Sequence, residues 1–288
     1  MVRGALSGHA PSPQDCRATA PDPSKLGHPL FTDRLKDRRQ RWLVEKQPNP
    51  YAAVASKTGG TDFMRAIGYS VPERYGIYPT LDDLPRFEDL PKAFALKPLN
   101  GFSSTGVFLM RDGVDLMRHR PLTRDQLIQL TRAETGRKAL AINGAWVAEE
   151  LLFNYDDPDT PAHDYKFLCF GPKVLAIVIN KATGLKDPKY RVWLRDPDWQ
   201  PLPYQIHWNR HSEPTLLPRP PCLDDMLHMA SDAAGQLNIF VRVDLFATQR
   251  GPVFCEFTGY PHSGNNITPR ADVWLGSHWK TLDGGVDP

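Results

Sequence analysis

The chain has 288 residues, and its 35 lysines and arginines nearly balance its 33 acids, so the net charge is only +2. With this balance, and with no apolar run near the roughly 20 residues needed to span a bilayer, we expect neither nucleic acid nor membrane insertion. The first residues lack the apolar core of a secretion signal, and the 4 cysteines include no CxxC pair, which favours a reduced, cytoplasmic protein.

The N-terminal part of the chain changes character twice. Residues 1 to 24 are rich in Pro, Ser, Ala and Gly and have little to bury, so we predict a flexible tail. The pattern from Phe31 to Lys46 predicts a helix, with Thr32 or Asp33 as its N-cap. Acids interrupt its arginines and lysines, which favours a solvated helix face over contact with an anionic polymer. A second helix is expected from Tyr51 to Gly68.

A small, polar loop follows the strand expected from Ala93 to Lys97. The sequence GFSSTG runs from Gly101 to Gly106, and a strand from Val107 to Met110 leads away from it. Backbone N–H groups of such a loop can approach phosphate oxygens closely, and Lys97 would add a positive charge. Three hydroxyl side chains would act as further donors: Ser103, Ser104 and Thr105. The context differs from a Walker A or GxGxxG motif, and an ordinary hairpin with a long loop stays the alternative.

Two adjacent acids, Glu149 and Glu150, interrupt the apolar segment WVAEELLF, which we expect to be a strand from Trp146 to Phe153. A helix from about Thr123 to Glu134 precedes it. Adjacent strand residues face opposite ways, so both acids cannot reach solvent if the strand is central. Either a side chain or the main chain after it contacts a ligand, or a carboxylate is satisfied on an edge strand.

Another pair of charged residues follows a loop expected from Asn154 to Pro161. Asp164 and Lys166 share one face at the start of a strand. They could bracket a ribose and phosphates, or form a surface ion pair worth under about 1 kcal/mol. The elements expected in this part are strands from Tyr165 to Phe170, Val174 to Ile179 and Tyr190 to Leu194, and a helix from Cys222 to Leu237.

Apolar and polar residues alternate from Val241 to Pro261, which predicts two strands joined by a turn. A period of two places Arg242 and Asp244 on one face of the first strand. On the second strand it places three residues on one face: Phe254, Glu256 and Thr258. Charges inside apolar strands are costly unless they pair or bind a metal. Two interpretations stay open: Asp244 and Glu256 hold Mg²⁺ while Arg242 meets a phosphate, or the three form a structural ion cluster.

Together these features resemble a known superfamily. In chain order they are a strand lysine, a phosphate loop, an acidic strand, Asp-x-Lys, Arg-x-Asp and a glutamate on the following strand. This order resembles the ATP-grasp superfamily, and it is most similar to the TupA-like branch, which is associated with teichuronopeptide and other cell-surface polysaccharide biosynthesis. The resemblance covers about Pro50 to Gly276. Its most specific segments are DYKFLCFGPKVLAIVIN, RDPDWQPLP, VRVDLFATQRGPVFCEFTGYPHSG and ADVWLG.

The resemblance implies an α+β fold in which two α+β subdomains with antiparallel sheets grip ATP. It implies an N-terminal helical segment over residues 25–50 and an ATP-grasp domain over residues 51–288, with lobes of about 51–150 and 151–288. The N-terminal region is reduced compared with ligases that use a full domain to bind an acceptor. Substrate recognition would then depend on the central and C-terminal parts, on Arg191 and Arg195, or on a partner protein. As a partner, the chain would have a second copy of itself in a homodimer, or another protein.

The resemblance also implies roles for individual residues. Those that would bind ATP are Lys57, Lys97, Gly101, Ser103, Ser104, Thr105, Gly106, Glu149, Glu150, Leu151, Asp164 and Lys166. Those that would hold magnesium are Asp244, Glu256 and Thr258. Arg242 and Lys97 would be catalytic by stabilising the transferring phosphoryl group. The segment from Glu149 to Leu151 would bind adenine, largely through main-chain groups, and Asp164 would bind the ribose.

The activity that the resemblance implies is an ATP-dependent carboxylate-amine ligase that forms an amide or peptide bond through an acyl phosphate. Its cofactors would be ATP and Mg²⁺, its substrates a small carboxylate and a small amine, and its setting cell-surface polysaccharide or specialised-metabolite biosynthesis. Thr258 departs from the pattern, because many ATP-grasp ligases have an asparagine there. Two alternatives stay open: a phosphotransferase (kinase) for a sugar or small hydroxyl compound, and a nucleotide-binding module without catalysis.

Overall fold

The computed structural model describes residues 27–101, 105–134, 139, 142–181, 191–203, 205–207, 213, 215, 217–279 and 282. The predicted flexible tail, residues 1 to 24, lies outside these residues. Within the described ranges, none of the helices is both long and apolar enough to span a bilayer.

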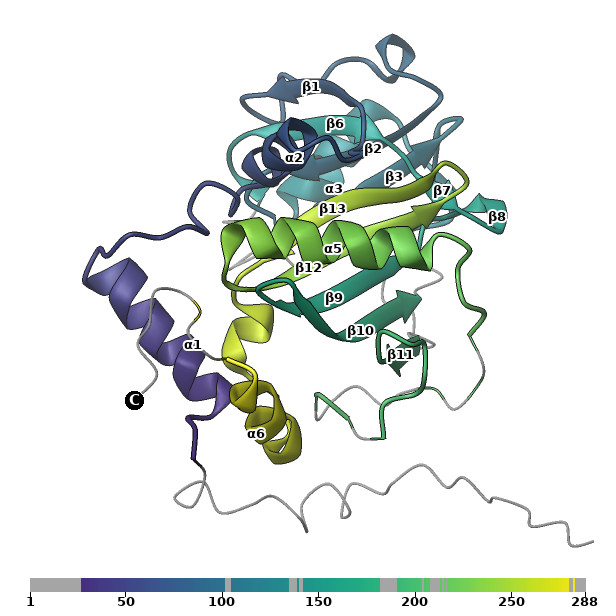
Figure 1. The fold of residues 1–288 in the computed structure, drawn as a ribbon. Helices are drawn as coiled ribbons and strands as arrows, with labels where there is room; N and C mark the ends of the chain where they lie inside the picture. The colour runs from purple at the N-terminus through teal and green to yellow at the C-terminus, as the bar shows by residue number, and fades with distance from the viewer. Residues whose placement is uncertain are drawn as a thin grey trace, which may run out of the picture.

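Two antiparallel sheets organise the fold (Figure 1). The six-stranded sheet has the order β1 (Arg74–Tyr78), β6 (Trp146–Glu150), β2 (Ala93–Pro98), β3 (Phe108–Arg111), β4 (Val114–Asp115) and β5 (Arg120–Pro121). The five-stranded sheet has the order β11 (Arg191–Arg195), β10 (Lys173–Lys181), β9 (Asp164–Phe170), β12 (Phe240–Thr248) and β13 (Gly251–Thr258). Between them in the chain is a hairpin of β7 (Phe153–Asn154) and β8 (Asp157–Pro161). The α+β class predicted from the sequence is confirmed.

Most regular elements lie where the sequence predicts them. Strands β2, β3, β9, β10 and β11 differ from their predicted bounds by only a residue or two, and helices α3 (Arg124–Arg132) and α5 (Leu223–Leu237) are equally close. Helix α3 begins with a capping box, in which the Thr123 side chain accepts a hydrogen bond from the Gln126 backbone and the Gln126 side chain bonds back.

Three predicted boundaries are wrong for local reasons. The strand expected to reach Phe153 stops at Glu150, and the loop expected from Asn154 to Pro161 contains β8, which pairs with β7. The helix expected to begin at Tyr51 begins only at Lys57, as α2 (Lys57–Ala66). It starts there because Ser56 is its N-cap, with its hydroxyl accepting a hydrogen bond from Gly59 N–H.

The first helix is also built differently from the prediction. Helix α1 (Phe31–Arg39) continues into a π-helical turn (Gln40–Val44), and its N-cap is Leu30, neither Thr32 nor Asp33. Thr32 instead bonds Asp272 of α6 (Pro269–Ser277) through both its backbone N–H and its hydroxyl, each at 2.8 Å. The start of α1 is thereby attached to α6, which lies far from it in the sequence.

Arg38 contradicts the predicted solvated helix face, because it is fully buried. Its guanidinium lies over the rings of Trp42 and Trp279, at 4.7 and 4.4 Å from their centroids, and Nη1 donates a hydrogen bond of 2.9 Å to the carbonyl of Gly259. Aromatic faces and a carbonyl replace the water that the charge loses. Helix α1 therefore reaches the segment that follows β13.

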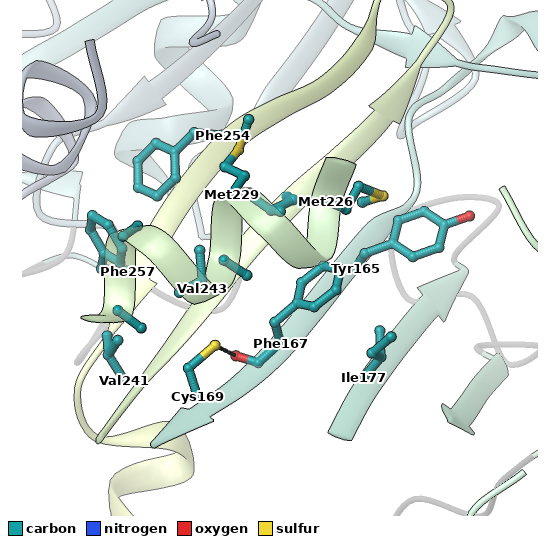
Figure 2. Close-up of a cluster of buried hydrophobic side chains, with 14 of the residues drawn as sticks. Tyr165, Phe167, Cys169, Ile177, Met226, Met229, Val241, Val243, Phe254 and Phe257 are labelled. Carbon is teal, nitrogen blue, oxygen red and sulfur yellow. Dashed lines mark hydrogen bonds between the residues drawn. The ribbon is translucent and has the colours of Figure 1, made fainter. Parts of the chain in front are cut away.

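The two faces of the five-stranded sheet have different coverings. On one face, Phe167 and Val243 belong to a core with Met226 and Met229 of α5 (Figure 2). On the other face, α1 and α6 cover the half that carries residues such as Leu168. The remaining half of that face carries polar residues from β9, β12 and β13, and these form the candidate site.

Helix α2 joins the core of the five-stranded sheet, although it precedes the six-stranded sheet in the chain. Val54 and Met64 belong to the same core cluster as Phe254 and Phe257. Gly60 lies so close to β13 that an added Cβ would be 3.2 Å from the Phe257 ring. This close approach brings the first turn of α2 beside β13. The division into lobes near residue 150 stays a prediction.

Candidate active site

A β-bulge shapes the strand that carries the candidate metal ligands. Asp244 pairs with Glu256 in the β12–β13 register, but the next residue of β12 pairs with Phe254, so Cys255 is left without a register partner. Phe254 and Phe257 consequently lie in the same core, with ring centroids 4.6 Å apart. The prediction that Phe254 shares a face with Glu256 is therefore wrong, because the extra residue reverses the alternation between them.

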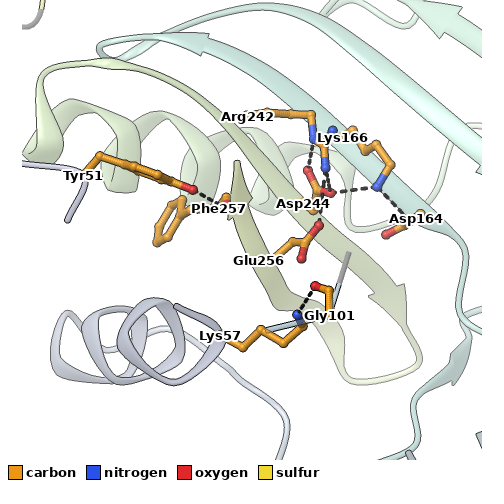
Figure 3. Close-up of polar contacts among 9 residues, drawn as sticks. All are labelled: Tyr51, Lys57, Gly101, Asp164, Lys166, Arg242, Asp244, Glu256 and Phe257. Carbon is orange, nitrogen blue, oxygen red and sulfur yellow. Dashed lines mark hydrogen bonds and ion pairs between the residues drawn. The ribbon is translucent and has the colours of Figure 1, made fainter. Parts of the chain in front are cut away.

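Asp244 is the centre of a buried charge network (Figure 3). It has no exposed surface, and Arg242 binds it in bidentate fashion, with Nε–Oδ1 and Nη2–Oδ2 distances of 2.6 Å. Lys166 donates from Nζ to Asp244 Oδ2 and to Asp164 Oδ2, both at 2.7 Å. The structure thus brings together Arg242, Asp244, Asp164 and Lys166 from two neighbouring strands, and Lys166 does more than form a surface pair.

The charges in this network determine its protonation. Burial opposes the charge of Asp244, but Arg242 and Lys166 outweigh it and hold the pKa of this carboxyl below its ordinary value. Burial likewise opposes the charges of Arg242 and Lys166, and the neighbouring carboxylates raise the pKa of both. All three groups are therefore ionised at neutral pH.

Glu256 lies across from Asp244 and has a different environment. Its carboxylate is 3.4 Å from Arg242 Nη2, and 38% of its side chain is exposed. Partial burial of the carboxyl and the negative charge of Asp244 raise the pKa of Glu256 above its ordinary value. Thr258, two residues further along β13, pairs in register with Arg242. Glu256 and Thr258 thus face the same side as the charge network.

Two lysines outside the strands of the five-stranded sheet lie near Glu256. Lys97 on β2 forms an ion pair with Glu149 on β6, with an Nζ–Oε1 distance of 2.5 Å. Lys57, at the start of α2, donates to the carbonyls of Leu99 and Gly101 at 3.2 and 2.7 Å. The charge of Glu256 acts on both lysines, and Figure 3 shows Glu256 between the Asp244 network and Lys57.

The two lysines have opposite pKa shifts. Burial lowers the pKa of Lys57, and the charge of Lys97 adds to this effect. Burial also opposes the charge of Lys97, but Glu149 outweighs it and raises the pKa. The charge of Glu256 offsets part of this lowering of the pKa of Lys57, and an anionic ligand would stabilise the Lys57 charge further.

A cavity of about 360 Å³ lies between these groups. It is lined by Ala55, Ser56, Lys57, Leu99, Asn100, Gly101, Glu256 and Phe257, so both parts of the fold contribute to it. Gly101 has no room for a side chain, because an added Cβ would be 2.7 Å from Pro98, and Gly106 has a φ of +72°. Thr105 is buried nearby, whereas Ser103 and Ser104 lie outside the described residues.

The predicted hinge residues have separate partners. Strand β6 lies between β1 and β2, so it is not an edge strand. Glu149 faces Lys97, whereas Glu150 accepts two hydrogen bonds from Arg250, at 2.9 and 2.7 Å, and Leu151 is buried. Arg250 belongs to the turn between β12 and β13, so this contact joins the two sheets beside the predicted adenine site.

Other residues considered for substrate recognition are not brought to this site. Arg195 pairs with Ile177 and Arg191 with Lys181 in the β10–β11 register, which places both arginines on the face that α5 covers. Arg195 is buried, and its guanidinium lies 6.0 Å from the Trp199 ring. Neither arginine therefore shares a face with Asp244, and their part in substrate recognition stays a prediction.

The donor set fits magnesium that is delivered with phosphates. Among the described residues, no group of three or more His, Cys, Asp or Glu side chains could hold a metal ion. Magnesium bound with a nucleotide needs only one or two carboxylates, since phosphate oxygens and water complete its octahedron. Asp244 and Glu256 supply these two, and within the described part of the chain Oδ1 of Asp244 accepts one hydrogen bond.

The comparison with protein families agrees with this geometry. The family model described as TupA-like ATPgrasp matches residues 38–280. The chain belongs to the TupA-like ATP-grasp family. The resemblance inferred from the sequence is therefore confirmed. No curated protein matches this TupA-like chain.

Comparison with solved structures identifies several ligases as similar to this chain. D-alanine-D-alanine ligase from Bacillus anthracis, complexed with ATP, is 14% identical over 84% of this chain and 69% of its own, with a TM-score of 0.50. L-amino acid ligase from Bacillus licheniformis is 16% identical over 90% of this chain and 58% of its own, with a TM-score of 0.48. The ATP-grasp ligase PsnB, complexed with its minimal precursor, is 14% identical over 74% of this chain and 54% of its own, with a TM-score of 0.41. The family model and the fold shared with the Bacillus anthracis ligase in complex with ATP confirm the predicted ATP-grasp fold. The TupA-like chain spans roughly half to two thirds of these proteins' lengths.

The TupA-like chain also places residues near the site that the sequence interpretation missed. Tyr51 donates from its hydroxyl to the carbonyl of Phe257, and the charges of Glu256 and Arg242 reach it. Cys255 lies near Lys97, and burial raises the pKa of its thiol well above the ordinary value. Neither could be found from alternation, because Tyr51 is remote in sequence and the bulge displaces Cys255. A third missed residue, Asn180, lies on β10 in register with Asp164.

Proposed function

We propose that this protein is an ATP-dependent carboxylate-amine ligase. The observation that carries the proposal is a cavity lined by both Glu256 and Lys57, with Asp244 paired to Glu256 on the next strand and Lys97 within reach of the charge of Glu256. Two carboxylates suited to a nucleotide-bound cation face two cations suited to its phosphates. Membership of the ATP-grasp family supports this interpretation over a structural ion cluster.

The proposed reaction has two steps. A carboxylate oxygen of the first substrate attacks the γ-phosphorus of ATP, the bond to the β,γ-bridging oxygen breaks, and ADP leaves. The amine of the second substrate then attacks the acyl carbon, inorganic phosphate leaves, and the amine loses a proton. The first step requires little covalent work from a protein, because positioning and neutralisation of charge stabilise its transition state.

The residues on each side of the cavity have distinct roles in this proposal. Lys57 and Lys97 bind the phosphate oxygens, with the loop from Gly101 to Gly106 beside them. Arg242 stabilises the transferring phosphoryl group, while Asp244 and Glu256, with Thr258, hold magnesium, which neutralises phosphate charge when it is bound. These roles need no protein nucleophile.

The nucleoside binds at the opposite end of the site. The main chain from Glu149 to Leu151 binds the adenine, and Asp164 binds the ribose. Lys166, which holds Asp164 and Asp244 together, also approaches the phosphates. The contact between Glu150 and Arg250 keeps the adenine segment beside the β12–β13 turn.

The setting is part of the proposal as well. We propose small-molecule carboxylate and amine substrates from cell-surface polysaccharide or specialised-metabolite biosynthesis, and a cytoplasmic location. Free thiols at Cys169, Cys222 and Cys255 agree with a reducing compartment.

The test is a screen for ADP release with pairs of amino acids, amino sugars and uronic acids, followed by mass spectrometry of any product. A ligase releases inorganic phosphate in step with an amide product, and Glu256→Gln abolishes both, whereas Glu88→Gln at an exposed position leaves them unchanged. Phosphate retained on the product would identify a kinase instead. ATP binding without acceptor-dependent turnover across the screen would identify a binding module.

A further inference from the structure

Asn180 presents a buried hydrogen-bond acceptor that the protein leaves unused. It lies near the end of β10, and only 8% of its surface is exposed. Its Oδ1 atom is buried, and no donor among the described residues reaches it. Buried carbonyl oxygens of side chains are nearly always hydrogen-bonded, since the loss of water is otherwise uncompensated. An unused acceptor at this depth indicates a ligand that supplies the donor.

The sheet register places Asn180 beside Asp164. The two are direct partners in the β9–β10 pair, so their side chains project from the same face, with Cβ atoms about 4.5–5.5 Å apart. That face is the one on which Asp164 meets Lys166 and Lys166 meets Asp244. Asp164 uses only Oδ2 in this network, and the described residues offer its Oδ1 no donor. Two adjacent acceptor atoms therefore have no donor among the described residues.

The direction of β9 indicates which end of the ligand these acceptors meet. Lys166 and its register partner Asp244 lie in the row that contains Glu256, at the cation end of the site. Asp164 is in the next row of that face, and Asn180 is one strand further from Glu256. In the same direction, Tyr155 of the segment after β6 donates its backbone N–H to Ala247 on β12. Asn180 thus lies toward the adenine segment and away from the phosphates.

We propose that Asn180 accepts a hydrogen bond from one ribose hydroxyl of ATP while Asp164 accepts one from the other. This inference rests on the proposed function, because it assumes that ATP binds in the site. A vicinal diol presents two donors at adjacent positions, which matches two acceptors on paired strands. Adenine would meet the main chain of the hinge, and an acceptor amine must approach the phosphorylated end near Glu256. Asn180 is therefore a residue that selects ribonucleotides.

The test compares the binding of Mg-ATP, Mg-2′-dATP and Mg-3′-dATP by calorimetry. We expect the wild type to bind ATP about five- to tenfold more tightly than the deoxynucleotide that loses the neutral hydrogen bond to Asn180, and by a larger factor than the one that loses the charge-assisted bond to Asp164. Asn180→Leu should weaken ATP by a similar factor and bind one deoxynucleotide as the wild type does, so one of the two preferences disappears. Asn180→Asp keeps an acceptor and should keep the preference.

A second measurement separates ligand binding from a structural role. Because Oδ1 has no partner among the residues that the structure describes, Asn180→Leu should leave the melting temperature without nucleotide unchanged or raised. A marked fall in that temperature would overturn the proposal, as would ATP affinity equal to that of the wild type or an equal loss for all three nucleotides. If wild-type protein bound no nucleotide, the proposed function itself would fail, which is a distinct result.

Discussion

Asp244 and Glu256 are register partners on adjacent strands, yet their carboxyl groups have opposite pKa shifts. Asp244 is buried more deeply, but three hydrogen bonds from Arg242 and Lys166 stabilise its charge. Glu256 has only a 3.4 Å contact with Arg242 and faces the charge of Asp244. Glu256 is consequently the carboxylate that gains most from a bound cation.

As the pH falls, nucleotide binding should weaken at a higher pH than it would if Glu256 had the pKa of an ordinary glutamate. The pKa of Glu256 is raised, so its carboxylate takes up a proton at a higher pH and then competes with magnesium. We expect Mg-ATP affinity to fall as the pH drops through this raised value. Calorimetry from pH 5 to 8 measures the fall, and Glu256→Gln should show weaker binding with little dependence on pH in that range. Parallel profiles for the two proteins would contradict the role of Glu256.

Asp244→Asn should destabilise the fold even without nucleotide. The change removes one partner of a buried ion network and leaves Arg242 and Lys166 uncompensated, so we expect a loss of about 3–5 kcal/mol in urea unfolding. Because the folded-state pKa of Asp244 is lowered, its stabilisation is present above the unfolded pKa and lost as pH falls through the folded one. The double variant Asp244→Asn with Lys166→Met should lose less unfolding free energy than the two single variants lose together. Additive losses would argue against the network.

Glu256→Gln should behave in the opposite way toward stability. A carboxyl whose pKa is raised by folding makes the ionised protein less stable at neutral pH, so its neutral analogue should unfold at an equal or higher urea concentration. Activity should nevertheless be lost. Loss of both stability and activity would indicate that Glu256 supports the fold.

Lys97 should contribute to nucleotide binding through its charge. Replacing Lys97 by Met should weaken Mg-ATP by at least about tenfold, as expected for charge-assisted hydrogen bonds to phosphate. The change also strands Glu149, so the double variant Lys97→Met with Glu149→Gln should recover stability without recovering affinity. Lys92→Met, at an exposed position just before β2, is the control and should bind as the wild type does. Wild-type affinity in the double variant would remove Lys97 from the site.

Arg38→Met should destabilise the protein by about 2–4 kcal/mol, because it removes cation–π contacts and the bond to the Gly259 carbonyl. Arg38→Lys should recover little of this, since an ammonium lacks the planar group that lies between two indole rings. Lys36→Met, on the exposed side of α1, should change stability by less than about 0.5 kcal/mol. Urea unfolding of the three variants measures these differences.

The parts of the site that follow a local period could be predicted from the sequence. The strand period of two correctly predicted that Arg242 and Asp244 share one face, because β12 has no extra residue between them. The same rule failed at Phe254, where the bulge at Cys255 reverses the faces without any turn residue to mark it. Asn180 was missed for another reason. Its proximity to Asp164 depends on the register of the β9–β10 hairpin, which the sequence pattern does not reveal.

The non-local packing of the fold was also beyond prediction from local pattern. The burial of Arg38 depends on Trp279 and Gly259, which follow it at a great distance in sequence. An arginine among exposed charges has the same local signature whether or not aromatic rings later cover it. Assignment of α2 to the five-stranded sheet likewise required the contact between Gly60 and Phe257.

The attachment of α1 to α6 has a consequence for how the protein is made. Thr32 and Asp272 are 240 positions apart, and contacts of such separation form late, because the intervening chain must first be closed into a loop. A ribosome releases α1 long before its partner helix exists. Phe31 and Leu35 of α1 therefore stay exposed until α6 has been synthesised, and during that interval the nascent protein is prone to aggregation.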